Sequence, residues 1–377
     1  MKARCNERAV AWLLFAAVCA AVLATQAWPP WEQQLAGQYA SDVHYSYERI
    51  AAAAPALPES GIDAPHAYRF AVHWALGAVT EPTDVRTAYR VATSLLLLLA
   101  CALVLASARA LQAPLRVQAL AVGTLAASAY PARYLLAAPG MLSDALFTAG
   151  LAGACLGLVA RRPALTAGAL VVAVAGRQTA LPVALALGLA YLVERAPWRT
   201  RLIRAAVVAV PAVAVYALLA TVSARFAEFG DGLIEMSVLG EPGDLRALAG
   251  HAGRVALGVA IPAAILLGAR RHALAASGPL LAGLVVALQA LALAPGFAIG
   301  NEPRLAGLAA PALAVAVAAA LTASPPGRTA TVALATVLGA GSLHHLYASV
   351  GPTRNVEWAV LVAASTLVAG VATLRGR

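Results

Sequence analysis

Residues able to do acid–base chemistry gather in a short polar segment of an otherwise apolar chain. Between Ala40 and Ala51, the carboxyl group of Asp42 is followed closely by His44, Tyr45, Tyr47, Glu48 and Arg49. A carboxylate in such company can act as a general base on an incoming hydroxyl group. Asp42 also suits a helix N-cap, because a helix is expected over residues 43–54. The two roles are compatible.

Arginines in two further segments suit the binding of an anion. Arg69 lies in Pro65-His66-Ala67-Tyr68-Arg69-Phe70, inside an amphipathic stretch from His66 to Val79 that is too short to span a bilayer. Its guanidinium group can hold a phosphate by charge-assisted hydrogen bonds, or it can extend from an interfacial helix towards water.

Arg177 lies between two apolar arms, 164–176 and 180–193, each shorter than the ~20 residues of a full crossing. We expect it below the outer surface, in a cavity lined by protein or water, with Gln178 beside it. The alternative is an arginine that extends to the interface from the end of a short helix.

Three other polar positions are candidates. Asp144 opens an apolar span and suits either a functional carboxylate or a helix N-cap. Arg304 follows Glu302, with which a weak surface ion pair is the alternative. The adjacent His344 and His345 point about 100° apart on a helix, so they do not chelate one metal from one face.

Composition makes this a membrane protein. Of 377 residues, 61% are hydrophobic and 12% charged, and the mean hydropathy is +0.78. A soluble domain carries about twice that charged fraction. We therefore predict an all-α, polytopic helical membrane protein of about twelve segments, two of them short. It forms a single transmembrane domain over residues 1–377.

The predicted spans follow the apolar runs. We place the first at 9–27, as an anchor that is not cleaved, although it also resembles a signal peptide. The others, apart from the two short arms, are expected at 88–110, 117–136, 143–160, 202–222, 249–268, 273–296, 305–323, 329–350 and 357–374.

The net charge of +10 is distributed unequally between the two sides of the membrane. If Met1–Arg4 is cytoplasmic, sixteen basic and two acidic residues fall on that side, and eleven basic and fifteen acidic residues on the other. This is the positive-inside pattern and argues against a nucleic-acid partner. Both termini are then cytoplasmic, and the loops 28–87, 137–142, 223–248, 297–304 and 351–356 are extracytoplasmic.

Other chemistries lack their motifs. The chain has no phosphate-binding Walker loop, dinucleotide fingerprint, His-Glu-x-x-His or Gly-x-Ser-x-Gly. Four scattered cysteines show neither metal-ligand spacing nor a disulfide framework, and we expect small apolar fillers. An outward-facing enzyme without access to ATP needs an activated substrate that is itself in the membrane.

The ordered polar segments resemble the GT-C superfamily, the polyprenyl-phosphate-sugar-dependent membrane glycosyltransferases. The similar segments are Asp42 with Tyr47-x-x-Ile50-Ala51, Ala64–Phe70, Ser143–Leu146, Gly176–Leu181 and Glu302–Leu305 ahead of Pro311. The likeness in order and spacing covers residues 1–200, a catalytic module with loop 28–87. Residues 201–377 form variable helices that match only in character.

The resemblance implies an inverting sugar transfer to an extracytoplasmic hydroxyl group of a lipid or envelope glycan, in a bacterial inner membrane. Asp42 is then the general base. Arg177, with Arg69 and Arg304, stabilises the phosphate charge, and Tyr47, His44, Asp144 and Gln178 complete the substrate site. No cofactor is implied beyond the lipid-linked donor. We expect no metal ion, because a second acidic motif is missing.

Two other classes of function remain. A transporter or flippase also fits short helices around an arginine, and it predicts an internal repeat that the sequence lacks. A lipid-binding scaffold without catalysis is the third. Substitution of Asp42 separates the scaffold from the enzyme.

Overall fold

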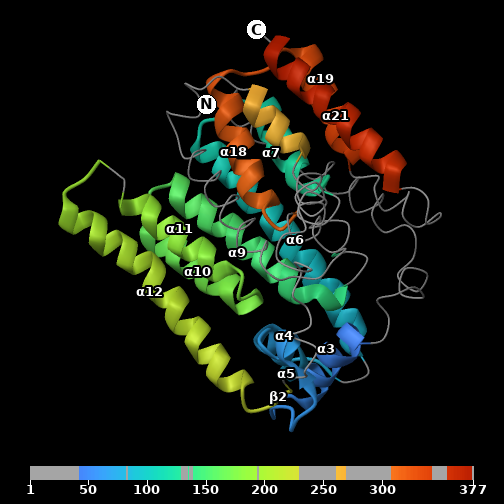
Figure 1. Cartoon of the computed structure of the whole chain (residues 1–377), viewed down its shortest axis with the longest axis vertical. Helices are drawn as coiled ribbons and strands as arrows, with labels where there is room; N and C mark the ends of the chain where they lie inside the picture. Colours follow the sequence, from blue (N-terminus) through green and yellow to red (C-terminus); the bar gives the residue numbers. More distant parts are fainter. Residues whose placement is uncertain are drawn as a thin grey trace, which may run out of the picture.

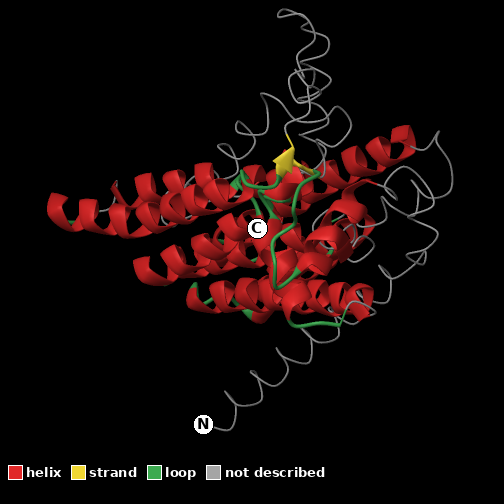
Figure 2. Ribbon diagram, turned by 90° about the horizontal axis from the view of Figure 1, so that it is seen from below, coloured by secondary structure: helices red, strands yellow, loops and turns green. Residues whose placement is uncertain are grey.

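The protein is a bundle of α-helices with a small layer of short elements at one end. In this computed structural model, the described residues are 42–81, 84–128, 135, 139–192, 195–228, 260–268, 307–341 and 355–375. The long helices run alongside one another (Figures 1 and 2). The only strands within these ranges are two parallel two-residue segments, so the all-α prediction is confirmed at this level.

The bundle begins with α6 (Val85–Ala110) and α7 (Leu115–Ala126). A 3-10 turn, η3 (Pro139–Met141), leads into α9 (Leu142–Val159). The predicted short arms are α10 (Pro163–Gly176) and α11 (Ala180–Leu192), and α12 (Trp198–Ser223) follows. Further along the chain come α18 (Ala310–Ala323), α19 (Arg328–Gly341) and α21 (Asn355–Arg375).

Three of the described helices, α6, α9 and α12, are long and apolar enough to cross a membrane. At about 1.5 Å per residue, the 14 residues of α10 and 13 of α11 reach only about 21 and 20 Å. The predicted spans 9–27 and 273–296 lie outside the described residues, so the total of about twelve stays a prediction.

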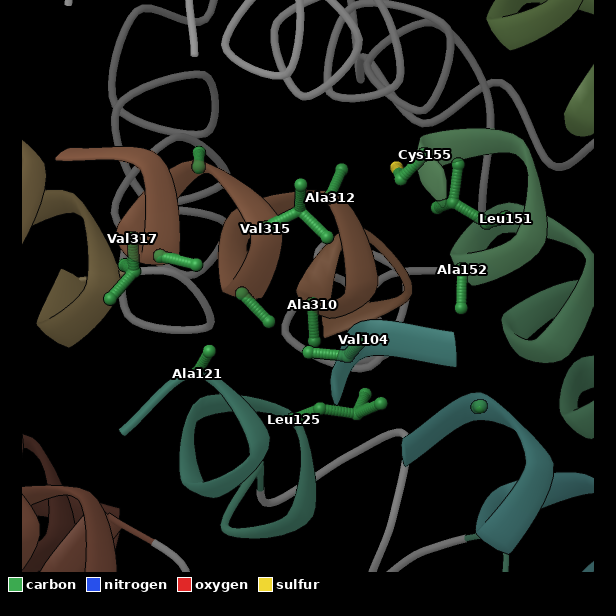
Figure 3. Close-up of a cluster of buried hydrophobic side chains, with 14 of the residues drawn as sticks. Val104, Ala121, Leu125, Leu151, Ala152, Cys155, Ala310, Ala312, Val315 and Val317 are labelled. Atoms are coloured by element: carbon green, nitrogen blue, oxygen red, sulfur yellow. The ribbon is translucent and has the colours of Figure 1, made fainter. Parts of the chain in front are cut away.

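Small apolar residues fill the core of the bundle. Figure 3 shows side chains from α6, α7, α9 and α18 meeting in one cluster. Glycine permits a close contact between α9 and α10: a Cβ atom on Gly157 would lie 2.5 Å from the backbone nitrogen of Thr166. Such close approach of backbones at small residues is typical of helices packed in membranes.

Large apolar side chains remain exposed on α12. Ile203, Val210 and Leu218 are 63%, 61% and 60% exposed. A soluble protein rarely leaves a contiguous apolar surface of this kind uncovered. The exposed face therefore fits a helix in contact with lipid, and with the apolar composition it indicates a membrane-embedded protein.

The layer at the end of the bundle consists of α3 (Asp42–Ala53), β1 (Ile62–Asp63), α4 (Ala64–Ala67), α5 (Phe70–Ala78) and β2 (Ala227–Glu228). We call it the cap layer. Strand β1 pairs with β2, with Ile62 opposite Ala227. The prediction of a helix at 43–54 is confirmed to within one residue. The predicted helix from His66 to Val79 is instead broken into α4 and α5.

The chain crosses the bundle back and forth, which sorts its turns into two groups. Helices α6, α9 and α11 start at the cap layer, while α10 and α12 end there. The turns at 111–114, 160–162 and 195–197 lie at the opposite end. The described parts of the predicted extracytoplasmic segments 28–87, 137–142 and 223–248 thus lie at the cap layer, and the described arginine-rich turns lie away from it.

Candidate functional site

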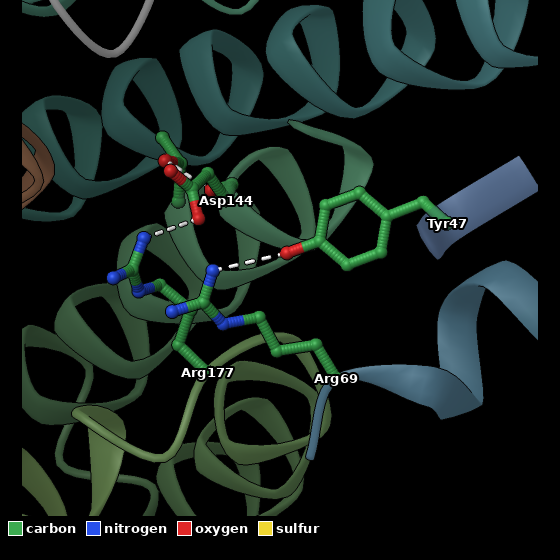
Figure 4. A network of polar contacts seen from close by, with 5 residues as sticks. Tyr47, Arg69, Asp144 and Arg177 are labelled. Carbon is green, nitrogen blue, oxygen red and sulfur yellow. Dashed lines mark hydrogen bonds and ion pairs between the residues drawn. The ribbon is translucent and has the colours of Figure 1, made fainter. Parts of the chain in front are cut away.

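A buried ion pair joins the start of α9 to the turn between α10 and α11. The Nη1 atom of Arg177 donates a short hydrogen bond to Oδ1 of Asp144 (Figure 4). The side chains are 5% and 1% exposed. Burial of both charges is costly unless they neutralise each other, so the pairing explains how Arg177 can lie inside the bundle.

Backbone contact places the two charges at the same level of the bundle. Gly176 is the last residue of α10, and a Cβ atom there would lie 2.5 Å from the carbonyl oxygen of Ser143. Only glycine allows that approach, which brings the next residue, Arg177, against the first turn of α9. The prediction of a buried Arg177 is confirmed, at 4% exposure.

Asp144 is not the N-cap of its helix. Helix α9 begins at Leu142 with Met141 as N-cap, and no side chain caps it. The N-cap interpretation of Asp144 is therefore wrong. After the 3-10 turn of η3 the helix starts at Leu142, two residues before Asp144, so the carboxylate faces α10. Its position in the first turn also favours a negative charge.

A second arginine approaches from the cap layer. Arg69 is the N-cap residue of α5, and its Nη1 atom donates to the Tyr47 hydroxyl group across 3.0 Å. Helix α5 contacts both α9 and α10. In Figure 4 the guanidinium groups of Arg69 and Arg177 point into one region from the cap layer and the bundle. The structure thus brings together Tyr47, Arg69, Asp144 and Arg177.

Tyr47 is held by a buried polar network. Its ring, 0% exposed, stacks on His73 with 3.9 Å between centroids. The Tyr89 hydroxyl group donates to the Tyr47 carbonyl oxygen at 3.2 Å and lies 2.8 Å from Nδ1 of His73. A hydroxyl group has one proton, so when Tyr89 donates it to the Tyr47 carbonyl oxygen, Tyr89 accepts from His73 and the imidazole carries its proton on Nδ1.

Sequence reasoning did not identify His73 or Tyr89. A signal was present, because His73 is the only polar side chain besides Trp74 in the helix Phe-Ala-Val-His-Trp-Ala-Leu-Gly-Ala of α5. A histidine in so apolar a helix needs a buried partner. Nothing in the sequence indicated that Tyr89, sixteen residues later on another helix, supplies it.

Several buried polar atoms around the ion pair make no hydrogen bond within the described parts of the chain. They are Ser143 Oγ, Gln178 Oε1, Thr179 Oγ1 and Arg69 Nε. A buried polar group that lacks a partner costs about 1–3 kcal/mol. This end of the bundle therefore suits a polar ligand that supplies both donors and acceptors.

The other predicted site residues are less fully described. Asp42 and His44 are the first and third residues of α3, and the structure describes their backbone but not their side chains. Arg304, His344 and His345 lie outside the described residues. In the described ranges no three His, Cys, Asp or Glu side chains converge as metal ligands. Metal independence stays a prediction.

Arg49, part of the first polar segment, stabilises a turn of the cap layer. Its guanidinium group donates from Nη1 to the Gly61 carbonyl oxygen at 2.7 Å and from Nη2 to that of Ser60 at 2.9 Å. Gly61 has φ of +78°, a left-handed conformation that glycine adopts without strain. The two hydrogen bonds fasten the turn before β1 to α3.

Comparison with family models, with curated proteins and with solved structures finds no match for this chain. The likeness to the GT-C superfamily therefore rests on the segments of the sequence that carry it.

Proposed function

We propose that this chain is a membrane glycosyltransferase of the GT-C type. It would transfer a sugar, with inversion, from a polyprenyl-phosphate donor to an extracytoplasmic hydroxyl acceptor in a bacterial inner membrane. The ordered polar segments of residues 42–181 support the class of reaction. The geometry at the cap layer supports the use of an anionic, lipid-linked donor.

One observation carries the proposal. Arg69 and Arg177 point into the same region, and Asp144 forms an ion pair with Arg177. These three side chains bring two positive charges and one negative charge to the interface between bundle and cap layer. A phosphodiester carries one negative charge, and a guanidinium group binds phosphate oxygens in a planar, two-pronged geometry.

The proposed reaction uses this charge directly. The Asp42 carboxylate takes the proton of the acceptor hydroxyl group, and the acceptor oxygen forms a bond to the anomeric carbon. The bond from that carbon to the phosphate oxygen breaks, and the lipid leaves as a phosphate monoester with one more negative charge. Arg69 and Arg177 stabilise that growing charge in a site with little water.

Helix α3 links the proposed base to the phosphate site. Asp42 and Tyr47 are five residues apart on one helix, which is about 7.5 Å along its axis. Tyr47 in turn binds Arg69. Helix α3 therefore carries both the proposed base and Tyr47, which binds the phosphate ligand Arg69.

Sidedness also supports the proposal. The turns rich in arginine lie at the end of the bundle opposite the cap layer, and positive charge favours the cytoplasmic side. A cap layer on the outer face gives the site access to acceptors outside the cell and to donors within the membrane.

The test is sugar transfer by the protein in lipid nanodiscs, with a radiolabelled polyprenyl-phosphate sugar and a crude envelope acceptor fraction. Asp42→Asn should reduce transfer by at least a hundredfold, because general-base catalysis contributes about 10²–10⁴-fold. Glu48→Gln is the matched control on the same helix and should transfer normally. Wild-type rates in Asp42→Asn would refute the assignment of the base.

A transporter for an anionic or lipid-linked substrate is the second candidate. The pair of short helices α10 and α11 around a buried arginine favours it, since broken helices form substrate sites in transporters. Uptake into proteoliposomes that survives Asp42→Asn and is lost in Arg177→Ala would support this candidate over the enzyme.

A further inference from the structure

Arg69 is one of two residues, Tyr68 and Arg69, that interrupt the helix of the cap layer. Helix α4 ends at Ala67 and α5 starts at Phe70. Between them Arg69 has φ of −100° and ψ of 12°, outside the helical region. The break changes the direction of successive side chains, so Tyr68, Arg69 and Phe70 do not follow the spacing of one helix face.

The residues on both sides of Arg69 contact α12 and the turn that follows it. The Tyr68 ring stacks parallel to that of Tyr216, with 6.4 Å between centroids and 4° between planes. The Phe70 ring meets Phe226 edge to face, with 5.5 Å between centroids. Such aromatic pairs contribute about 0.5–1.5 kcal/mol beyond the area they bury.

The segment that follows α12 makes a third contact with the cap layer. Directly after Phe226, Ala227 and Glu228 form β2 and pair with Ile62 and Asp63 of β1. Ile62, Phe70 and Phe226 are all at least nine-tenths buried and belong to one cluster with Tyr47. Residues 62–70 therefore contact α12 and the residues 224–228 that follow it, before, at and after the helix break.

We propose that Tyr216 and Phe226 are positioning residues that fix the guanidinium group of Arg69 beside the Asp144–Arg177 ion pair. Neither touches the proposed ligand. Each contacts a neighbour of Arg69, while the Tyr47 hydroxyl group accepts a hydrogen bond from the guanidinium group itself. The inference rests on the proposed use of Arg69 as a ligand for a lipid phosphate.

The physical reason lies in the side chain of Arg69. A long, flexible arginine loses much rotamer freedom when it binds an anion, and a backbone already fixed on two sides lowers that cost. Helix α12 contacts α10 and α11 within the bundle, so the attachment also ties the position of Arg69 to the helices around Arg177.

The experiment measures binding of two probes, farnesyl phosphate and uncharged farnesol, to the full chain in nanodiscs. Tyr216→Ala and Phe226→Ala should each weaken binding of farnesyl phosphate by about tenfold, since a charge-assisted hydrogen bond to Arg69 is lost. Binding of farnesol should stay unchanged. Tyr216→Phe keeps the ring and should restore binding to within about twofold.

Leu218→Ala is the matched control, because Leu218 lies two residues along α12 and is 60% exposed. It should bind both probes as the wild type does. The decisive variant combines Tyr216→Ala with Arg69→Ala. If Tyr216 acts through Arg69, the double variant binds farnesyl phosphate no more weakly than Arg69→Ala alone.

Three results would overturn the inference: additive losses in the double variant, equal weakening of farnesol binding, or no binding of farnesyl phosphate by the wild type. The transferase proposal is judged separately, by sugar transfer in the wild type and in Asp42→Asn. Coupled Arg69 and Tyr216 effects without any transfer would sustain the positioning role and reject the enzyme.

Discussion

Removing one charge of the Asp144–Arg177 pair should destabilise the protein more than removing both. Asp144→Asn leaves a buried guanidinium group without its counter-ion, and Arg177→Gln leaves a buried carboxylate. With side chains 5% and 1% exposed, solvent screens neither charge. The cost of breaking a buried pair, about 3–5 kcal/mol, therefore applies in place of the smaller surface value.

That cost translates into a measurable shift in melting temperature. An unfolding entropy of about 2.1 cal/mol/K per residue, over 377 residues, gives roughly 0.8 kcal/mol/K. Each single variant should therefore melt about 4–6 °C below the wild type. Tryptophan fluorescence of purified protein in one detergent, during a slow temperature ramp, gives the measurement.

The double variant Asp144→Leu with Arg177→Met should melt above either single variant. It buries no charge, and apolar replacement of a buried pair is often neutral or stabilising. Its farnesyl phosphate binding should nevertheless be lost. The surface pair of Glu48 and Arg86, 32% and 79% exposed at 3.0 Å, is the control, and Arg86→Gln should shift melting by about 1 °C or less. Additive losses in the double variant would refute this reasoning.

Three further predictions test the packing, the network and the sidedness. Tyr89→Phe removes the hydroxyl partner of the buried His73 Nδ1 atom and should cost about 1–3 kcal/mol, with weaker farnesyl phosphate binding, whereas Tyr191→Phe, which also loses a buried hydroxyl group, should leave binding intact. Gly157→Ala forces α9 away from α10 and should cost about 1–3 kcal/mol by thermal melting. In intact cells, an impermeant maleimide should label Ser60→Cys and spare Arg162→Cys until the membrane is opened; the reverse pattern would invert the topology.

The boundaries of α3, α10 and α11 followed closely from the sequence because local chemistry sets them, whereas the span predicted at 117–136 corresponds to α7, which ends at Ala126. The apolar runs at 164–176 and 180–193 end at charged or polar residues, and the helices α10 and α11 end within one residue of those limits. The helix at 43–54 ends before Pro55 for the same reason. Proline and charge act on a helix within one turn, so a pattern of a few residues is enough to predict them.

The break between α4 and α5 could not be found in the same way. Residues 66–79 hold no proline or glycine near Tyr68 and Arg69, and their amphipathic pattern fits one continuous helix. What favours the break is contact with Tyr216 and Phe226, about 150 residues further along the chain. Tertiary contacts of that range override local propensity. The pairing of β1 with β2 could not be predicted from the sequence for the same reason.

The Asp144–Arg177 pair could be predicted from the sequence only in part. Short helices on either side of Arg177 placed it near the outer end of the bundle, and Asp144 opens the preceding span at that same end. An isolated arginine there is too costly, so a carboxylate at the same level was the natural partner. Sequence alone left Asp144 divided between a functional carboxylate and a cap of its own helix, and it did not pair Asp144 with Arg177. The choice depends on where α9 begins, and a start at Leu142, set by the 3-10 turn before it, turns the carboxylate towards α10.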